Sequence, residues 1–354
     1  MVFIGRNTAE MFEIVKGLCI AISARVDCEE CMQRNRLNGY STIFINMLSR
    51  ARQCWEQGIA GMALLEMEEN DWLLAVCDDM LTRQNQDGRL CTVEKTRCQT
   101  DPALSIQPVL RAWQLTGEAR YRQAAERSID FYKQSGDKTA DGVLYHILGL
   151  PELWADSAAM LPASLAAMGE AEMAVQQMRG LCGKLRLENG LYAHRWNDAE
   201  QRFVRKQAWG AGNGWILVGL AWTIRILGKE HEHTLELMRL YTDLSEALLP
   251  WRLPSGLYRD VLDDPQSFEE CQTATMQAYS AMVLYEEGML DESAVPFAKA
   301  TLDTVSGHAD SHGAIHDCPG SPEFVNNGTS TEMQAFWLML YAVLKRKGAV
   351  QCDC

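Results

Sequence analysis

Five short glycine-containing segments recur along this chain, and their spacing restricts the possible folds more than any other feature. Each segment has a small or polar residue before the glycine, and in four of the five an apolar residue follows directly, the exception being Arg89 after Gly88. The glycines are Gly88, Gly142, Gly190, Gly256 and Gly313, roughly 50 to 65 residues apart. One antiparallel helix pair and one turn fit that interval. The repeat therefore predicts about six helical hairpins in 354 residues.

The segments between these turns have the periodicity of helices. Apolar residues recur at three- and four-residue intervals, and alternating β-branched runs are almost absent. The pattern predicts an all-α protein. The twelve predicted helices span residues 8–25, 39–56, 71–85, 103–116, 119–135, 155–168, 170–185, 213–227, 233–249, 267–287, 293–305 and 331–345.

A helical hairpin cannot bury its apolar face alone, so the hairpins must pack on one another. Six stacked hairpins can close into a ring whose inner helices share one core. We therefore predict an (α/α)6 toroid in which residues 1–354 form a single domain. The glycine turns would lie at one end and supply the walls of a pocket. An open helical solenoid is the alternative on periodicity alone.

Composition disfavours several classes of partner. The 47 acidic and 33 basic residues give a net charge of −14, which opposes binding to nucleic-acid phosphates. No apolar run approaches the roughly 18 to 20 residues that span a bilayer, and no secretory signal pattern is present. The 12 cysteines are scattered through a chain too long to need a disulfide framework. We expect a cytoplasmic protein with reduced thiols and no membrane partner; the oligomeric state is not indicated.

Aromatic and polar residues gather around one predicted helix start. His194-Arg-Trp is followed by Trp209-Gly-Ala-Gly-Asn-Gly-Trp215, which includes Asn213. Indole faces stack on sugar rings, while imidazole and amide groups give directional hydrogen bonds to hydroxyls. The combination favours carbohydrate binding. The alternative is that Trp209 and Trp215 only fill the core.

Two acidic residues stand at the starts of predicted helices. Asp156 opens a helix that is otherwise apolar, and Asp101 precedes Pro102 just before another. Each carboxylate could be only an N-cap. If the ring forms, both helix starts can open on the same pocket. The pKa values of two such acids would separate, and the more desolvated acid would keep a proton for general acid catalysis.

Four motifs occur in order: Leu153-Trp-Ala-Asp-Ser-Ala-Ala-Met160, the Trp209 to Trp215 segment, the segment from Gly256 to Glu270, and Gly328-Thr-Ser-Thr-Glu-Met-Gln-Ala-Phe336. With these motifs the chain from about Asp101 onward resembles unsaturated uronyl hydrolases of glycoside hydrolase families 105 and 88. The resemblance implies a six-hairpin toroid, in agreement with the glycine spacing.

The resemblance also implies an activity. Such enzymes remove the 4,5-unsaturated uronic acid that polysaccharide lyases leave at the non-reducing end of an oligosaccharide. A carboxylic acid protonates C4 of the vinyl ether, water adds at C5, and the hemiketal opens. Asp156 matches the catalytic acid/base and Asp101 the second acid, and neither a metal nor another cofactor is implied. The predicted substrate-binding residues are His146, His194, Trp209, Asn213, Trp215 and Glu270.

One departure affects specificity. Pectin-directed members commonly carry Arg at the third position of the tryptophan motif, where this chain has Ala211. The lost guanidinium would be a bidentate donor for a uronate carboxylate. The nearby cations that might replace it are Arg195, Arg205, Lys206 and Arg259.

Other interpretations stay open. The two acids would also suit an inverting glycosidase acting on a saturated uronoside, and a non-catalytic carbohydrate-binding toroid needs them only as caps. Metal-like spacing occurs at Cys28/Cys31 and at His308, His312 and His316. We do not predict a metal site there, because the first pair lacks a second CxxC and His312 falls in a glycine turn.

Overall fold

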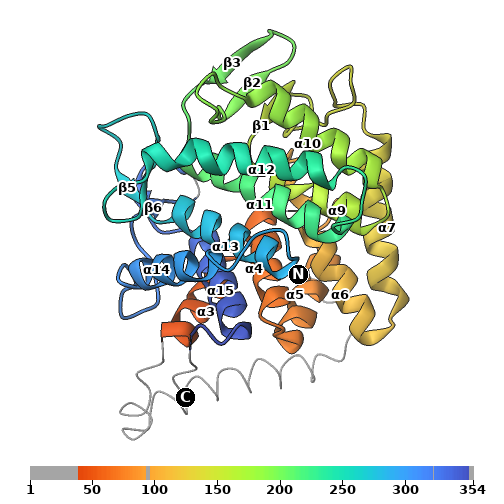
Figure 1. Cartoon of the computed structure of the whole chain (residues 1–354). Coiled ribbons are helices and arrows are strands. Elements are labelled where there is room, and N and C mark those ends of the chain that lie inside the picture. The colour runs from red at the N-terminus through yellow and green to blue at the C-terminus, as the bar shows by residue number, and fades with distance from the viewer. Residues whose placement is uncertain (1–38, 93–95, 322, 351–354) are drawn as a thin grey trace, which may run out of the picture.

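Helices alternate along the chain between an outer and an inner layer (Figure 1). The computed structural model describes residues 39–92, 96–321 and 323–350. The outer helices are α3 (Gly39–Arg50), α5 (Asn70–Thr82), α7 (Ala119–Gln134), α10 (Ala171–Leu185), α12 (Thr234–Leu248) and α14 (Ala294–Ser306). The inner helices are α4 (Cys54–Glu66), α6 (Ile106–Thr116), α9 (Pro162–Ala167), α11 (Gly210–Leu227), α13 (Gln272–Glu286) and α15 (Thr331–Arg346).

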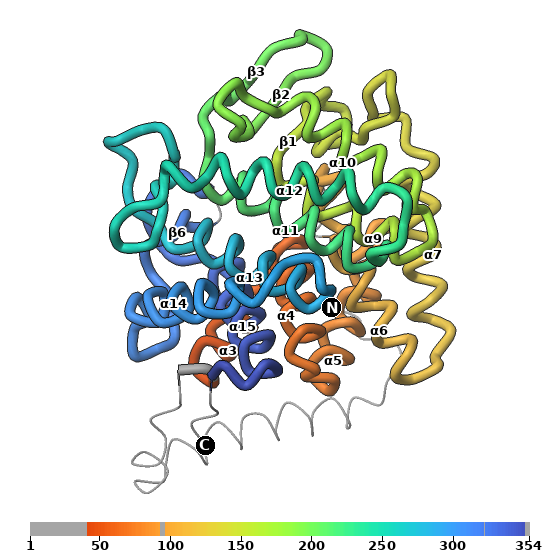
Figure 2. The backbone as a smooth tube through the Cα atoms, viewed as in Figure 1, coloured from red at the N-terminus to blue at the C-terminus, as the bar shows by residue number. Residues whose placement is uncertain are grey.

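The inner helices form a closed ring. Each contacts the next in the order α4, α6, α9, α11, α13 and α15, and α15 contacts α4. In Figure 2 the earliest described helix, α3, lies beside the last, α15, and these two helices are in contact. The (α/α)6 toroid is therefore confirmed, and the open solenoid is wrong for the part of the chain that the structure describes.

Burial distinguishes the two layers. Residues 210–224 of α11 and 272–284 of α13 are buried on every side, so neither helix has a polar face. Close packing requires a small residue at Gly219, where a Cβ atom would lie 2.0 Å from the carbonyl oxygen of Ala158. The outer helix α12 is amphipathic instead, and buries Leu237, Leu244 and Leu248 along one stripe.

The five repeated glycines occupy turns that lead from an outer helix to the next inner segment. All five have positive φ, between 74° at Gly313 and 101° at Gly88. At these two positions a Cβ atom would lie 2.2 Å from the carbonyl carbon of Thr42 and 2.3 Å from the carbonyl oxygen of Arg127. Only glycine fits both the backbone conformation and the space.

Short strands lie in the connections that follow the glycine turns, between the outer helices and the inner helices. Strand β1 (Glu152–Trp154) pairs with β2 (Arg195–Asn197), which pairs with β3 (Arg202–Arg205). Two smaller antiparallel pairs are β4 (Tyr258–Arg259) with β5 (Glu269–Glu270), and β6 (Cys318–Pro319) with β7 (Asn327–Gly328). The β1–β2 pairing aligns the loop before α8 (Ser157–Met160) with the loop that carries His194.

Three predicted helix boundaries were wrong. The segment 39–56 contains all of α3 and only the first three residues of α4, and the rest of α4 was not predicted. The segment 155–168 is divided into α8 and α9 at Pro162. The segment 267–287 becomes helical only at Gln272, because β5 precedes it. The predicted helix 8–25 lies outside the described residues.

None of the helices in the described part of the chain combines the length and the apolar character needed to cross a bilayer.

Candidate active site

The glycine turns deliver polar side chains to the starts of the inner helices. His146, His194 and Asp260 each lie four residues after a turn glycine. Since these turns connect outer helices to inner segments, the three side chains approach the same end of the ring. The sequence repeat is thus also a repeat of functional positions.

Asp101 and His146 form the first buried pair. Asp101 begins the short 3-10 helix η1 (Asp101–Ser105) ahead of α6 and is 4% exposed. The Nε2 atom of His146 lies 3.5 Å from its Oδ1. The other ring nitrogen lies 2.8 Å from Thr100 Oγ1 and 3.0 Å from Ser157 Oγ. These hydroxyls fix the imidazole so that Nε2 faces the carboxyl group.

Asp156 and His194 form the second pair. Asp156 is the N-cap of α8, and its Oδ2 lies 3.4 Å from His194 Nε2. This separation is an electrostatic contact rather than a well-formed hydrogen bond. Together these four residues are called the acid–histidine cluster below.

Aromatic rings join the two pairs. Trp154, at the end of β1, stacks on His146 with ring centroids 4.3 Å apart and an interplanar angle of 16°. Its ring also meets His194 edge-on at 5.6 Å. Trp209, the N-cap of α11, lies 4.6 Å from His194 on another side. The result is a wall of indole and imidazole surfaces suited to stacking on a sugar.

The two carboxyl groups differ in protonation. Burial, followed by the charges of Cys98 and Asp156, raises the pKa of Asp101 well above its ordinary value. Burial also opposes ionisation of Asp156, but His194 and His146 outweigh it, so the pKa of Asp156 lies below its ordinary value. Burial lowers the pKa of His146 to about 4, leaving a neutral imidazole at pH 7. The two pKa shifts therefore have opposite directions, so Asp101 holds a proton more readily than Asp156.

Several polar atoms of the acid–histidine cluster make no hydrogen bond to the described residues, although they lie in the electrostatic contacts given above. Asp101 Oδ1, Asp156 Oδ2 and both ring nitrogens of His194 are buried and make no hydrogen bond. More than about 90% of buried polar groups in proteins are hydrogen-bonded. Their concentration here indicates a site whose hydrogen bonds are completed by a ligand.

The fold agrees with a comparison of the sequence with protein-family models. The sequence model of Glycosyl Hydrolase Family 88 matches residues 28–332. The chain belongs to this family. It is therefore a glycoside hydrolase.

Individual relatives of this family 88 enzyme have low sequence identity. The chain is 24% identical over 251 residues to the unsaturated rhamnogalacturonyl hydrolase YesR of Bacillus subtilis, covering 64% of this chain and 70% of that one. It is 26% identical over 132 residues to an unsaturated 3S-rhamnoglycuronyl hydrolase of Formosa agariphila, covering 36% and 35%. A crystal structure of a possible GH105 member from Salmonella enterica has a TM-score of 0.73, 15% identity and 83% coverage of both chains.

Two of the predicted substrate-binding residues, Asn213 and Glu270, make hydrogen bonds to the backbone of the family 88 enzyme itself. Asn213 is fully buried; its amide donates to the backbone oxygens of Tyr192 and Trp209 at 3.0 and 2.8 Å and accepts from the Tyr192 N–H at 2.8 Å. Both donors of Asn213 are thus occupied. Glu270 is fully buried and accepts hydrogen bonds from the N–H groups that begin α13, including that of Thr273 at 3.1 Å. These contacts hold the helix starts in place.

Trp215 lies away from the acid–histidine cluster. It is 3% exposed, and its ring packs on Phe336 of α15 at 5.2 Å. Its six-residue separation from Trp209 places the two rings in different surroundings, since Trp209 contacts His194 instead. A role for Trp215 in sugar contact stays a prediction.

Two residues of the site were not predicted from the sequence. Trp154 stacks between the histidines, and Asp260 accepts a hydrogen bond from Trp209 Nε1 at 2.9 Å. Trp154 lies within the motif that contains Asp156, and Asp260 has the same position after its turn glycine as His146 and His194. The register of the repeat is the signal that finds Asp260.

Ala211 is fully buried at the start of α11. Among the candidate replacement cations, Arg195 forms an ion pair with Glu152 at 2.5 Å. Arg259 donates to the Ser267 carbonyl at 3.0 Å. The guanidinium of Arg205 lies over Trp209, 5.8 Å from the ring centroid, and no carboxylate in the described part of the chain lies within salt-bridge distance of it. Lys206 is exposed and also has no ion-pair partner in the described chain, so Arg205 is preferred for its position over Trp209.

The histidines near the C-terminus pair separately with acids. His308 Nδ1 lies 2.8 Å from Asp317 Oδ2, and His316 Nε2 lies 2.9 Å from Asp310 Oδ2. Neither pair belongs to a three-residue metal-ligand group among the described residues. Cys28 and Cys31 lie outside the described residues.

Proposed function

We propose that this family 88 enzyme removes a 4,5-unsaturated uronic acid from the non-reducing end of lyase-generated oligosaccharides. The observation that carries the proposal is the acid–histidine cluster, where two carboxyl groups with pKa values shifted in opposite directions lie beside aromatic walls. The names of the relatives from Bacillus subtilis and Formosa agariphila support the same substrate class.

Asp156 is the proposed acid/base. Protonation of C4 breaks the C4=C5 double bond and leaves an oxocarbenium ion shared by C5 and the ring oxygen. Water then adds to C5 and returns its proton to the carboxylate. The hemiketal that results opens, expels the remaining oligosaccharide as an alcohol and leaves a keto acid. The enzyme is regenerated with one water consumed.

Asp156 must gain a proton before it can donate one. In the free enzyme His194 and His146 favour its ionised form. A bound uronate adds a second negative charge, which favours the protonated form of a neighbouring carboxyl group. The substrate therefore helps to place Asp156 in its acid form, and His194, 3.4 Å away, is the nearest proton carrier.

Asp101 is proposed to act as a neutral hydrogen-bond donor. A protonated carboxyl group can bind a sugar oxygen without repelling the uronate. The inner helices α4, α11, α13 and α15 all begin at this end of the ring, so their dipoles favour an anionic substrate. We also propose that the chain acts as one catalytic domain in the cytoplasm, as its scattered cysteines suggest.

The direct test uses a panel of unsaturated disaccharides made by polysaccharide lyases. We expect the ultraviolet absorbance of the conjugated enol ether to disappear as the two sugars separate. In D2O the keto acid should carry one deuterium from solvent at C4, because that carbon receives the catalytic proton. Cleavage of saturated uronosides with no effect on the unsaturated panel would instead establish the inverting glycosidase, which also uses one protonated and one ionised carboxyl group.

A further inference from the structure

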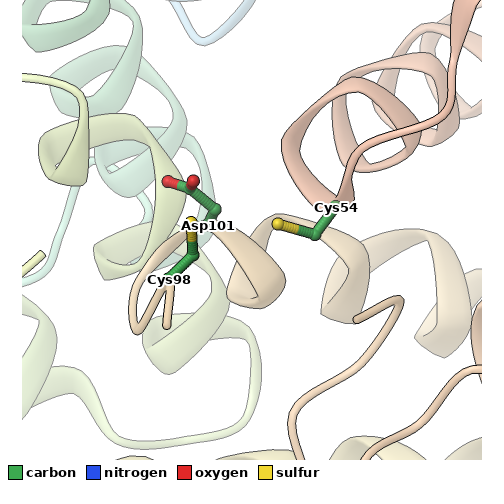
Figure 3. A group of neighbouring side chains, drawn as sticks. All are labelled: Cys54, Cys98 and Asp101. Carbon is green, nitrogen blue, oxygen red and sulfur yellow. The ribbon is translucent and has the colours of Figure 1, made fainter. Parts of the chain in front are cut away.

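Two thiols, those of Cys54 and Cys98, lie beside Asp101. Figure 3 shows Cys54 at the start of α4 pointing toward Cys98 and Asp101, which stand before and at the start of η1. The two Sγ atoms and one carboxylate oxygen all lie within 4.8 Å of one another. Cys98 and Asp101 are three residues apart in the sequence, and the packing of α4 against η1 brings Cys54 to them.

This group has the composition of a site for a thiophilic metal ion. Zn²⁺ is commonly bound by cysteine sulfur at about 2.3 Å and carboxylate oxygen at about 2.0 to 2.2 Å. Two sulfurs on one Zn²⁺ can lie at most about 4.6 Å apart, so the observed positions require only small side-chain rotations. The spacing alone would fit many metal ions, but two sulfurs select a soft or borderline one.

Burial separates this group from ordinary surface clusters. Cys54 is 1% exposed and Asp101 4% exposed, and Asp101 Oδ1 is a buried oxygen with no hydrogen-bond partner in the described chain. The other three-residue group, Glu172, Glu232 and His233, lies at the surface and carries no sulfur. Asp101 Oδ1 lies 3.5 Å from His146 Nε2, so the Asp101 carboxyl group faces the acid–histidine cluster as well as the two thiols.

We propose that Cys54, Cys98 and Asp101 bind one thiophilic divalent cation, such as Zn²⁺, and that this binding inhibits the enzyme. Metal binding releases the thiol protons. The bond to Asp101 also occupies the carboxyl group that the proposed function assigns to the sugar. The binding site stands on its own geometry, whereas the inhibition rests on the proposed function.

The binding test is a Cd²⁺ titration of the full reduced chain, followed by thiolate-to-metal charge-transfer absorption. Wild type should bind one more Cd²⁺ per chain than Cys54→Ala, and Cys98→Ala should match Cys54→Ala. Cys77→Ala removes a buried thiol of α5 outside the group and should behave as wild type. Circular dichroism checks that each variant is folded. Equal Cd²⁺ stoichiometry in wild type, Cys54→Ala and Cys98→Ala would overturn the site.

The inhibition test measures turnover of an unsaturated disaccharide against Zn²⁺ concentration. Mutating a residue that only hydrogen-bonds to a metal ligand typically lowers metal affinity about 10- to 100-fold. Loss of a ligating thiol should lower the affinity at least as much, so Cys54→Ala should raise the half-inhibiting Zn²⁺ concentration about 100-fold or more. A chelator should restore wild-type activity. Cys54-dependent Cd²⁺ binding without Zn²⁺ inhibition would keep the metal site and overturn the proposed role of Asp101.

Discussion

The inner helices carry groups of charged side chains at both ends of the ring, and the hydrogen bonding of these side chains differs between the two ends. At the C-terminal ends, Glu66 of α4 accepts hydrogen bonds from Arg225 at 2.8 Å and Tyr279 at 2.6 Å. Arg346 of α15 contacts its other oxygen. Glu286 of α13 accepts from the two arginines at 3.1 and 2.9 Å. This closed-end cluster (Glu66, Arg225, Glu286 and Arg346) places positive charge where the helix dipoles are negative.

At the N-terminal ends the acid–histidine cluster leaves buried atoms of Asp101, Asp156 and His194 without hydrogen bonds. Each such atom costs about 1 to 3 kcal/mol of stability. No atom of the closed-end cluster is among the unpartnered buried atoms of the described chain. The comparison teaches that one end of the same helices stabilises the ring, while the other keeps hydrogen-bonding capacity for a substrate.

The largest effect should come from removing the proposed acid/base, Asp156, from the acid–histidine cluster. Asp156→Asn should lower kcat/KM by about 10² to 10⁴, because an amide accepts hydrogen bonds but cannot deliver a proton. The melting temperature should stay close to that of wild type. Kinetics on an unsaturated disaccharide and a thermal melt measure both quantities.

Two variants control this experiment. Asp101→Asn should reduce activity less, since the amide remains a hydrogen-bond donor. Asp263→Asn changes an exposed acid and should leave activity unchanged. Activity of Asp156→Asn within about threefold of wild type would refute the assignment of Asp156 as acid/base.

The opposite result is expected at the closed end. Glu66→Gln should leave kcat/KM unchanged and lower the free energy of unfolding by about 2 to 4 kcal/mol, because Arg225 and Arg346 lose a buried anionic partner. Chemical denaturation measures the change. The matched control is Glu236→Gln, which removes an exposed partner of Arg179 and should cost about 1 kcal/mol or less. Equal costs for the two variants would contradict the comparison.

The sequence predicts the ring because glycine turns and amphipathic helices leave local signals. The five turn glycines all have the positive φ that their repeat suggested. The inner helix α4 was largely missed for a physical reason: it is buried on most sides and contains Gly58 and Gly61, so it shows neither an apolar stripe nor strong helix propensity. Gly58 is there because Leu104 lies 2.9 Å from the position its Cβ would take.

The sequence predicts the site less completely, because a motif does not show which way a side chain faces. Asp156, His194 and Trp209 do lie together, as the sequence analysis expected. Asn213 instead holds the backbone, although it belongs to the same motif. The thiols beside Asp101 come from segments separated in sequence, and only tertiary packing brings them together.

A smaller effect concerns the cation that replaces the missing motif arginine. Arg205→Ala should raise KM about 10- to 150-fold, the equivalent of losing one charge-assisted hydrogen bond of about 1.5 to 3 kcal/mol. The matched control is Arg202→Ala, since Arg202 lies on the same strand but is exposed and paired with Glu200. Steady-state kinetics distinguish the two. Equal KM values for both variants would show that neutral donors bind the uronate.

The smallest effect is the decrease in the free energy of unfolding at low pH that the closed-end cluster causes through Glu66. Burial opposes ionisation of Glu66, but Arg225 and Arg346 outweigh it and hold the pKa of Glu66 below its ordinary value of 4.5. Above that value Glu66 is ionised in both folded and unfolded chains, and the ion pairs contribute their full stability. As the pH falls below it, the unfolded chain takes up the proton first, so that contribution is lost.

Glu66→Gln lacks this titration. The difference in free energy of unfolding between wild type and Glu66→Gln should therefore be constant above about pH 5.5 and shrink as the pH falls through about 4.5 toward the lowered pKa. Denaturation curves at several pH values measure the difference, and the subtraction cancels every other titrating group that the two chains share. A difference that stays constant down to about pH 3 would mean that the arginines stabilise the neutral and ionised forms equally, and the electrostatic account of the closed end would fail.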